Sequence, residues 1–226
     1  MMAHYHDKLK QIKNLSDIDL VEFNIGDSVA TFRVVDDSAE TVKLLSKWRD
    51  THSNAFFDKF KVTEERTKMW IHRQILDLPD RVLFMIILNG QKVAHMGIDS
   101  YDEHDNSAKL SNFLRGVREG YPYLMLKGEI ALSKLMFELL KLSKIKVCMW
   151  SDNLGMILHA TKLGCNVVGN SPFKRVFTDD GWKWEKITLQ SEYAERYVLS
   201  MEITPEQFYS LHKNKLQDVK IRSDLL

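Results

Sequence analysis

Apolar and polar residues alternate most clearly in the middle of the chain, where they predict an antiparallel meander. The apolar run Val82–Leu88 meets Asn89-Gly90, and a second β-type run follows over Lys92–Tyr101. Asn-Gly between two such runs is the strongest short-range signal for a β-hairpin. The polar turn 102–106, DEHDN, then leads into Ala108–Leu114, which we expect to add a third strand.

The N-terminal part predicts a leader and another hairpin. Residues 1–17 are polar and lysine-rich without clear periodicity, so we expect a flexible leader. Two short β-type runs follow, Leu20–Asn24 and Val29–Val35, with the turn dipeptide Gly26-Asp27 between them. Because a chain of 226 residues can build one α/β domain with a sizeable core, we expect a single domain over residues 18–226.

Two helices are expected between this hairpin and the meander. Asp37 followed by Glu40 resembles an N-cap with its partner at the third helical position, which predicts a helix over Ser38–Trp48. A second helix is predicted to begin near Thr63 and to end before Pro79.

After the meander the pattern changes to a helical one. The nearly all-apolar segment Tyr123–Leu142 predicts a long, largely buried helix, and Ile145–Trp150 follows as a short buried strand. Strand, helix and strand with so little connecting chain imply a right-handed parallel crossover. A shorter helix, Leu154–Leu163, ends at Gly164. The expected fold class is therefore α/β (α+β mixed sheet), an antiparallel meander followed by a parallel β-α-β crossover.

The C-terminal part predicts two strands and a last helix. The strands are expected near Asn166–Val168 and over Trp182–Thr188. Thr204 and Gln207 have the spacing of a capping box with proline at the first helical position, so a helix is expected over Pro205–Lys215.

Charge and composition exclude several classes of protein. The 32 lysine and arginine residues against 31 aspartate and glutamate residues leave a net charge of +1, without the broad basic surface that nucleic-acid binding needs. The apolar runs are far shorter than the ~20 residues of a membrane helix, and the N-terminus has no apolar signal core, so we expect a cytoplasmic protein without membrane insertion. Cys148 and Cys165 lack CxxC spacing and the histidines form no ligand pair, so no metal is expected. The chain is expected to be a monomer or a homodimer.

One strand-to-helix turn has the composition of a phosphate-binding site. It spans Arg115–Met125, RGVREGYPYLM, where the meander passes into the long helix. Backbone N–H groups at a helix N-terminus, with the positive end of the helix dipole behind them, bind phosphates. Two glycines permit close approach of the backbone, and two arginines can reach a phosphate oxygen. The same composition also suits an ordinary strand-to-helix turn.

A further segment carries a resemblance to a known family. The stretch 151–165, SDNLGMILHATKLGC, resembles the closing segment of the GNAT superfamily of acyl-CoA-dependent N-acyltransferases, which reads N-x-x-A-I-x-L-Y-x-x-x-G-F. Asn153, Ile157 and Gly164 fit this pattern. The order of the Asn-Gly hairpin, the strand ending SNFLRG, the turn and the long helix also matches, so the resemblance covers roughly residues 29–190. It implies a GNAT-like fold with two splayed parallel strands, and acetyl-CoA or another short acyl-CoA as co-substrate.

The resemblance also implies which residues bind the acyl-CoA, with two departures from the family pattern. The implied residues are Phe113, Leu114, Arg115, Gly116, Val117, Arg118, Gly120, Tyr121, Leu124, Met125, Asn153 and Met156. The family's phosphate loop usually reads R-x-x-G-x-G, whereas here Tyr121 and Pro122 follow Gly120. The tyrosine that often protonates the departing thiolate falls at Ala160, and the neighbouring His159 points about 100° away around the helix.

Three residues of the meander are candidates for catalysis. Acyl transfer to an amine needs a neutral amine, an oriented carbonyl group and donors for the developing oxyanion. His95 and Asp99 alternate onto one strand face and are candidates to accept the proton of the amine, with surface or structural roles as the alternative. Asn112 is a candidate to orient the acyl group or the acceptor, unless it only satisfies backbone groups in the interior. If the parallel strands splay, a backbone N–H near Asn112 or Phe113 faces the thioester oxygen.

Candidates for acceptor binding come from two loops. His52 and Asn54 lie in the segment 50–60, DTHSNAFFDKF, whose polar and aromatic residues suit a pocket wall or an anchored surface loop. His104 in the turn after the second meander strand is a third candidate. For Trp182 and Trp184, we expect packing rather than a stacking platform.

The leading hypothesis is N-acylation of a nucleotide-linked amino sugar. SNFLRG followed by the YPYLM turn is similar to a branch of the superfamily that acylates such sugars. An alternative is acetylation of a protein N-terminus or lysine. An alternative from another class is a non-catalytic acyl-CoA-binding module, which Ala160 and the incomplete glycine loop favour.

Overall fold

The computed structural model describes residues 2–53, 61–117, 120–178, 181–188 and 192–225. The strands are β1 (Val21–Ile25), β2 (Ser28–Val34), β3 (Val82–Leu88), β4 (Gln91–Asp102), β5 (Ser107–Arg115), β6 (Lys144–Trp150), β7 (Asn166–Thr178), β8 (Gly181–Lys186), β9 (Arg196–Ile203) and β10 (Val219–Ile221). The helices are α1 (Met2–Lys13), α2 (Ala39–Thr51), α3 (Glu64–Ile71), α4 (Leu124–Glu138), α5 (Leu154–Leu163) and α6 (Pro205–His212), with the short η2 (His72–Leu76), η3 (Leu216–Asp218) and η4 (Ser223–Leu225).

All the described strands belong to one mixed sheet. Its order is β10-β1-β2-β3-β4-β5-β6-β9-β7-β8. β5 and β6 are parallel, and the other described pairs are antiparallel. Both hairpins of the meander are confirmed, and Leu88 pairs with Gln91 across the Asn-Gly turn. The mixed α/β fold class is therefore confirmed.

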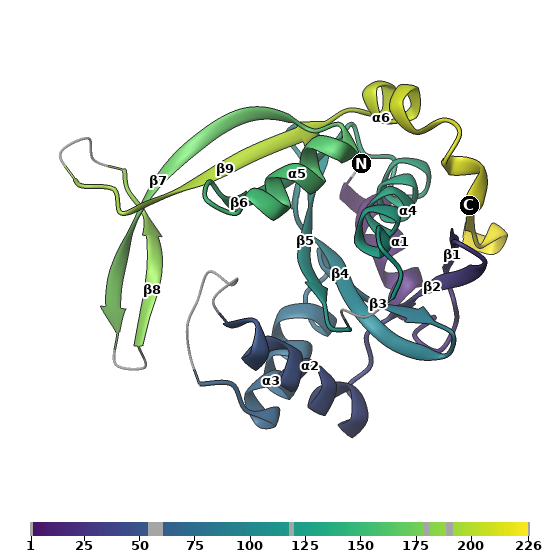
Figure 1. Cartoon of the computed structure of the whole chain (residues 1–226), viewed down its shortest axis with the longest axis horizontal. Helices are drawn as coiled ribbons and strands as arrows, with labels where there is room; N and C mark the ends of the chain where they lie inside the picture. The colour runs from purple at the N-terminus through teal and green to yellow at the C-terminus, as the bar shows by residue number, and fades with distance from the viewer. Residues whose placement is uncertain (1, 54–60, 118–119, 179–180, 189–191, 226) are drawn as a thin grey trace.

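Helices cover both faces of the sheet (Figure 1). On one face α4 packs on the strands from β1 to β6, and its interior residue Leu132 is fully buried. On the other face α2, α3 and η2 enclose a smaller core around Leu83 and Met85 of β3. The alternation of β4 follows from these two layers, since Met96 belongs to the first core while His95 faces α2. None of the described helices is long and apolar enough to cross a membrane.

The prediction of a flexible leader is wrong, because residues 2–13 form helix α1. Tyr5, Leu9 and Ile12 are buried to 1% exposure or less and join the main core. The Tyr5 ring stacks on Tyr101 with 4.1 Å between the ring centroids, and its hydroxyl donates to the carbonyl oxygen of Asp80. The apolar positions i, i+4 and i+7 were a helical signal in an otherwise polar segment.

Several predicted boundaries also need correction. Helix α2 is capped by Ser38, whose hydroxyl accepts from the Thr41 amide, while Asp37 pairs with His72. The long helix ends at Glu138, four residues before the predicted end. Strands β9 and β10 were not predicted, and β7 is much longer than the expected short strand. The final helix has its capping box at Thr204 but ends at His212.

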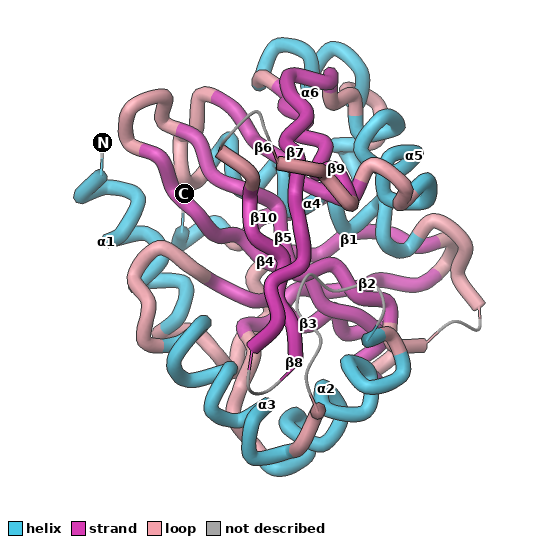
Figure 2. Tube along the Cα trace, turned by 90° about the vertical axis from the view of Figure 1, so that its left-hand side faces the viewer, coloured by secondary structure: helices cyan, strands magenta, loops and turns pink. Residues whose placement is uncertain are grey.

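The long β7 builds a feature that projects from the body of the molecule (Figure 1). β7 pairs with β9 over Asn166–Phe173, and beyond that it pairs with β8 over Phe173–Thr178. We call residues 171–178, 181–186 and 196–198 the arm. Viewed from its free end, the arm lies in front of the rest of the sheet, with α2 and α3 below it (Figure 2).

Candidate active site

The two parallel strands separate halfway along their length. Their register runs from Ser107 opposite Lys144 to Leu110 opposite Val147, whereas β5 continues to Arg115 and β6 to Trp150. Beyond Leu110, β6 stays paired with β9 on its other side but not with β5. The expected splay is confirmed, and we call the region between the diverging ends of β5 and β6 the opening.

A β-bulge lies on β5 at the opening. Gly97 of β4 pairs with Ser111 and His95 pairs with Leu114, so Asn112 and Phe113 together oppose Met96. Asn112 has φ 53°, a left-handed conformation that asparagine tolerates better than most residues. Its side-chain amide donates to the Ser111 hydroxyl at 3.1 Å. A bulge leaves an extra residue outside the regular ladder, here beside the opening.

His95 lies directly behind this bulge. Its ring is 4% exposed and stacks on Trp48 of α2, with 6.2 Å between the ring centroids. Burial lowers the pKa of His95 to about 4, and a hydrogen bond with the Asn112 backbone opposes this shift only in part. The structure therefore brings two predicted catalytic residues together. A ring with so low a pKa is a weak base, which argues against His95 as the proton acceptor.

Asp99 and His104 lie away from the opening. Asp99 pairs in register with Lys109, where β5 and β6 are still joined, and accepts a hydrogen bond from Ser100 at 2.7 Å. His104 is exposed in the turn before β5, and its amide donates to the Asp102 carboxylate. At about 3.3 Å per residue along β5, His104 is more than ~15 Å from Asn112. These placements separate both residues from the bulge at Asn112, and their predicted roles stay predictions.

The turn after β5 is held rigidly against the sheet. The amides of Gly116 and Val117 both donate to the Val93 carbonyl oxygen at 3.0 Å. Arg115 bonds the carbonyl oxygens of Val117 and Gly120 at 2.9 and 2.5 Å. Arg115 thus braces the turn, and the amides of Gly116 and Val117 already have a partner. Arg118 lies outside the described residues.

The end of the turn presents the N-terminus of α4. Gly120 and Tyr121 have φ 69° and 48°, and the N-cap residue Tyr123 has φ 71° with no side-chain capping bond. The Leu124 amide donates to the Tyr121 carbonyl oxygen at 3.3 Å, and the Met125 amide has no capping side chain. Tyr121 is an anchor, because its hydroxyl accepts from Asn89 at 2.8 Å.

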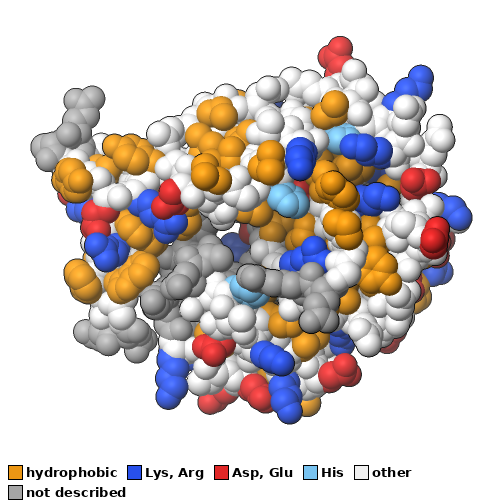
Figure 3. All heavy atoms as spheres, viewed as in Figure 1, with side chains coloured by type: hydrophobic (Ala, Val, Ile, Leu, Met, Phe, Trp, Pro, Cys, Tyr) orange, Lys and Arg blue, Asp and Glu red, His pale blue; other side chains and the backbone are white. Residues whose placement is uncertain are grey.

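Two hollows flank this turn. One, of about 340 Å³, is lined by the Asn-Gly hairpin and the turn, including Asn89, Arg115 and Tyr121. The other, of about 370 Å³, is mainly apolar and lies between α4, β1 and the segment after α6. Its rim carries Lys127 and Lys162 beside the ring of Tyr123. Figure 3 shows lysine and arginine side chains around α4 and α5 on this face.

The start of α5 matches the predicted pattern. Asn153 is the N-cap, and its side-chain oxygen accepts from the Met156 amide at 3.2 Å. Ala160 is buried, so the position of the family's tyrosine has no proton donor. His159 points away to α4, where Nδ1 lies 3.1 Å from the buried carboxyl group of Glu129. The hydrogen bond with Glu129 raises the pKa of His159, although burial opposes the rise.

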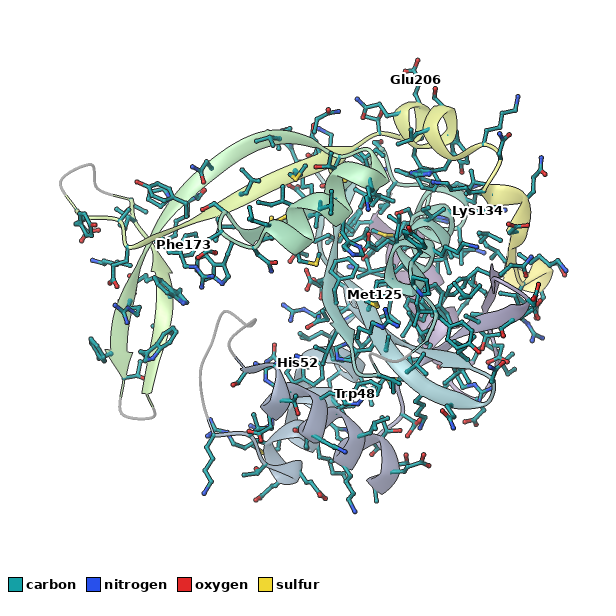
Figure 4. All side chains as sticks on the ribbon, in the orientation of Figure 1. Trp48, His52, Met125, Lys134, Phe173 and Glu206 are labelled. Carbon is teal, nitrogen blue, oxygen red and sulfur yellow. The ribbon has the colours of Figure 1, made fainter. Side chains whose placement is uncertain are left out.

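The predicted acceptor residues of the loop are only partly described. His52 is the C-cap of α2 and lies at the end of that helix that faces the arm (Figure 4). Asn54 lies outside the described residues. No group of three or more possible metal ligands occurs within the described ranges.

The sequence analysis missed the residues that β6 and β9 bring to the opening. Cys148 and Trp150 alternate with the core residues Val147 and Met149, so they lie on the face that His95 and α2 share. The Cys148 sulfur lies 3.7 Å from the Ser200 hydroxyl of β9. The alternation of side chains along the predicted strand Ile145–Trp150 could have shown that Cys148 and Trp150 lie on the face opposite to Val147 and Met149.

No protein-family model and no curated protein matches this sequence. Similar solved structures exist at low sequence identity. FdhC without ligand, described as a nucleotide-linked sugar GNAT, has a TM-score of 0.63 at 10% identity, over 89% of this chain and 98% of the other. A structure described as a putative acetyltransferase from T. thermophilus has a TM-score of 0.64 at 14% identity, over 87% and 95%.

A third structure holds ligands. Spermidine N-acetyltransferase from Vibrio cholerae, in complex with CoA and spermine, has a TM-score of 0.59 at 11% identity, over 79% of this chain and 97% of the other. Together with the parallel pair β5 and β6, their divergence and the bulge at Asn112, these likenesses show that the chain has the fold of the GNAT acetyltransferases.

Proposed function

We propose that this protein is an N-acyltransferase that moves an acetyl or other short acyl group from acyl-CoA to a primary amine. The observation that carries the proposal is the divergence of β5 and β6 beside the bulge at Asn112. A sheet with such an opening offers an unpaired strand edge to an extended ligand and a backbone donor at the end of that edge.

The acyl-CoA lies along three features of the chain in this proposal. The pantetheine amides pair with the free edge of β5 beyond Leu110, as a substitute strand. The diphosphate lies at the N-terminus of α4, where backbone amides and the helix dipole attract anions. The apolar hollow with Lys127 and Lys162 at its rim suits the adenosine and its 3′-phosphate.

The reaction then proceeds by direct attack. The amine nitrogen adds to the thioester carbonyl carbon, and a backbone N–H of the bulge at Asn112 or Phe113 donates to the oxyanion. The carbon–sulfur bond breaks, the thiolate of CoA leaves, and the attacking nitrogen loses its extra proton to solvent. Because a thiol has a reference pKa near ~8.5, the thiolate leaves without a dedicated acid, which is consistent with Ala160.

In this scheme His95 holds the bulge in place and does not accept the proton of the amine. Its neutral ring bonds the Asn112 backbone and fills the space beside Trp48. We therefore assign it as a positioning residue. Since the pKa of His95 is too low for this ring to accept the proton, we expect the rate to rise with pH as the amine itself loses its proton.

For the acceptor we propose a nucleotide-linked amino sugar. The SNFLRG strand and the YPYLM turn support this choice, as does the similarity of the fold to FdhC, described as a nucleotide-linked sugar GNAT. The experiment incubates the protein with labelled acetyl-CoA and parallel panels of nucleotide amino sugars, polyamines and lysine peptides. We expect label on the nucleotide sugars; label on peptides alone would overturn the acceptor assignment.

A thermal-shift titration tests the donor separately. We expect acetyl-CoA to raise the melting temperature, because a ligand that binds only the folded state stabilises it. A melting temperature that does not respond to acetyl-CoA would overturn the whole proposal. Stabilisation without transfer to any acceptor would identify a non-catalytic binding module instead.

Variants at Asn112 distinguish the contribution of its backbone conformation to catalysis from that of its side chain. Asn112→Gly removes the side chain but suits φ 53°, so we expect it to keep most of the kcat. Asn112→Val places a β-branched residue in a strained conformation, and we expect at least a tenfold loss of kcat in a folded protein. Equal losses in both variants would show that the side chain, not the bulge, is what catalysis needs.

A further inference from the structure

The arm carries a concentration of aromatic side chains on one face. In β7 the residues Phe173, Arg175 and Phe177 share a face, and their partners on β8 include Trp184 and Trp182. Arg196 of β9 pairs with Phe173, and Val198 pairs with Trp150 of β6. The alternate face of the arm instead bears Lys174, Lys183 and Glu185. We call the first set, with Trp150, the aromatic face.

This face is continuous with the opening. Trp150 is the last residue of β6, on the same side of the sheet as Cys148 and His95. From Trp150, ring contacts lead outward: the Trp150 and Trp184 centroids are 4.9 Å apart, and those of Trp184 and Trp182 are 5.5 Å apart. The aromatic face thus begins where the acyl group emerges in the proposed reaction.

The aromatic face also carries two arginines that lie over its rings and are paired with carboxylates. The guanidinium carbon of Arg196 lies 4.3 Å from the Trp150 ring centroid, and that of Arg175 lies 5.9 Å from Trp184. Asp152 and Glu195 hold these two arginines by their carboxylates. The indole nitrogen of Trp184 is buried yet donates no hydrogen bond to a described residue. Phe177 at the outer end is 79% exposed.

The aromatic face begins on the side of the sheet that α2 covers, because Trp150 on that side contacts Trp184. Figure 4 shows Phe173 at the bend of the arm, and Trp48 and His52 of α2 below it in this view.

We infer that the aromatic face binds the end of the acceptor remote from the amine, and that this end carries a planar ring such as a nucleobase. The inference rests on the proposed function and names the part of the site that selects the acceptor. A nucleobase stacks on tryptophan and phenylalanine rings whatever its hydrogen-bond pattern. Arg175 and Arg196 add guanidinium groups that lie over the tryptophan rings.

Calorimetric titration with nucleoside diphosphates tests this inference. The full chain is first saturated with CoA, so that the added nucleotides cannot enter the CoA site, and is then titrated with UDP, dTDP, CDP and GDP. We expect at least one to bind. Trp182→Ala and Phe177→Ala should weaken it about 5- to 100-fold, the usual cost of losing one stacked base contact.

Lys183→Ala is the matched control, because Lys183 stands between Trp182 and Trp184 on the alternate face. We expect it to bind nucleotide like the wild-type protein. Circular dichroism and the affinity for CoA should be unchanged in all three variants, since none of the changed residues touches the proposed CoA site. An affinity for nucleotide that falls equally in the control and the two aromatic variants would overturn the inference.

Other outcomes separate this inference from the proposed function. If CoA binds and no nucleoside diphosphate does, the inference fails while the proposed function stands. If nucleotides bind in a Trp182-dependent way but acyl transfer never occurs, the proposed function fails, while the inference that the aromatic face binds a nucleobase stands. If the protein sediments as a dimer that Trp182→Ala dissociates, the aromatic face is an interface between two copies and the inference is overturned.

Discussion

At the scale of single residues, the candidate active site depends on how closely α2 approaches the turn after β5. Trp48 contacts both Gly116 and the ring of His95. The sequence predicted on which strand face His95 lies, but it did not predict how deeply the ring is buried. The ring is buried by Trp48, a residue far away in the chain. The same limit applies to Gly116, because the sequence does not show that this glycine makes room for the indole ring of Trp48.

Gly116→Ala is expected to destabilise the protein. An added Cβ would lie 1.8 Å from Cε2 of Trp48, so the ring or the turn must move. Such overpacking costs about 1–3 kcal/mol, measurable by urea denaturation, and should weaken acetyl-CoA binding through the displaced turn. Gly155→Ala is the control, because its Cβ meets only an ordinary contact at 3.7 Å. If the two variants are equally stable, Trp48 does not limit the site.

His95 should make the protein sensitive to mild acid. Burial lowers its pKa to about 4, below the ordinary value of 6.5, so between these values the unfolded chain binds the proton and the folded one does not. Stability from this residue is therefore complete above pH 6.5 and falls as the pH drops towards 4. Between pH 7 and pH 5 the loss should be roughly 2 kcal/mol.

The measurement compares the free energy of unfolding at pH 7 and pH 5 for three proteins. His95→Asn should lose about 2 kcal/mol less than the wild type over this interval, because its side chain does not titrate. His104→Asn is the control, since His104 is exposed, and it should behave like the wild type. A wild type and a His95→Asn variant with the same pH dependence would refute the buried, neutral state of His95.

At the scale of elements, local signals predicted the meander, the crossover and both capped helices after it. Asn89-Gly90 and the capping box at Thr204 need only neighbouring residues, so the sequence shows them directly. β9 was missed because its burial, over Arg196–Ile203, does not alternate cleanly, and β10 is only three residues long. These strands exist because of their partners, which no local pattern reveals.

Helix α1 yields an element-scale prediction. Leu9 is fully buried in the main core, so Leu9→Ala should reduce the free energy of unfolding by about 2–5 kcal/mol. Lys10→Ala, on the exposed side of the same helix, should leave it nearly unchanged. Chemical denaturation of the two variants decides the matter. Equal stabilities would restore the idea of a loose leader at the N-terminus.

At the scale of the whole molecule, stability should be uneven, because the arm beyond Phe173 is a ribbon of two strands. Such ribbons are marginally stable alone, whereas β3, β4 and β5 are central and paired on both sides. In hydrogen–deuterium exchange we expect amides of 173–178 and 181–186 to exchange at least tenfold faster than those of β4. Exchange in the arm as slow as in β4 would show that another surface covers it.

The pairing of β1 with β10 has a consequence for how the protein is made. Val21 lies in register with Ile221, so two segments separated by almost the whole chain close one edge of the sheet. While the ribosome still holds residue 221, β1 has a partner only in β2. Domains fold during synthesis as soon as their contacts are available, and this closure comes last. A nascent chain arrested before residue 219 should thus keep an open strand edge, which is the state that chaperones must protect.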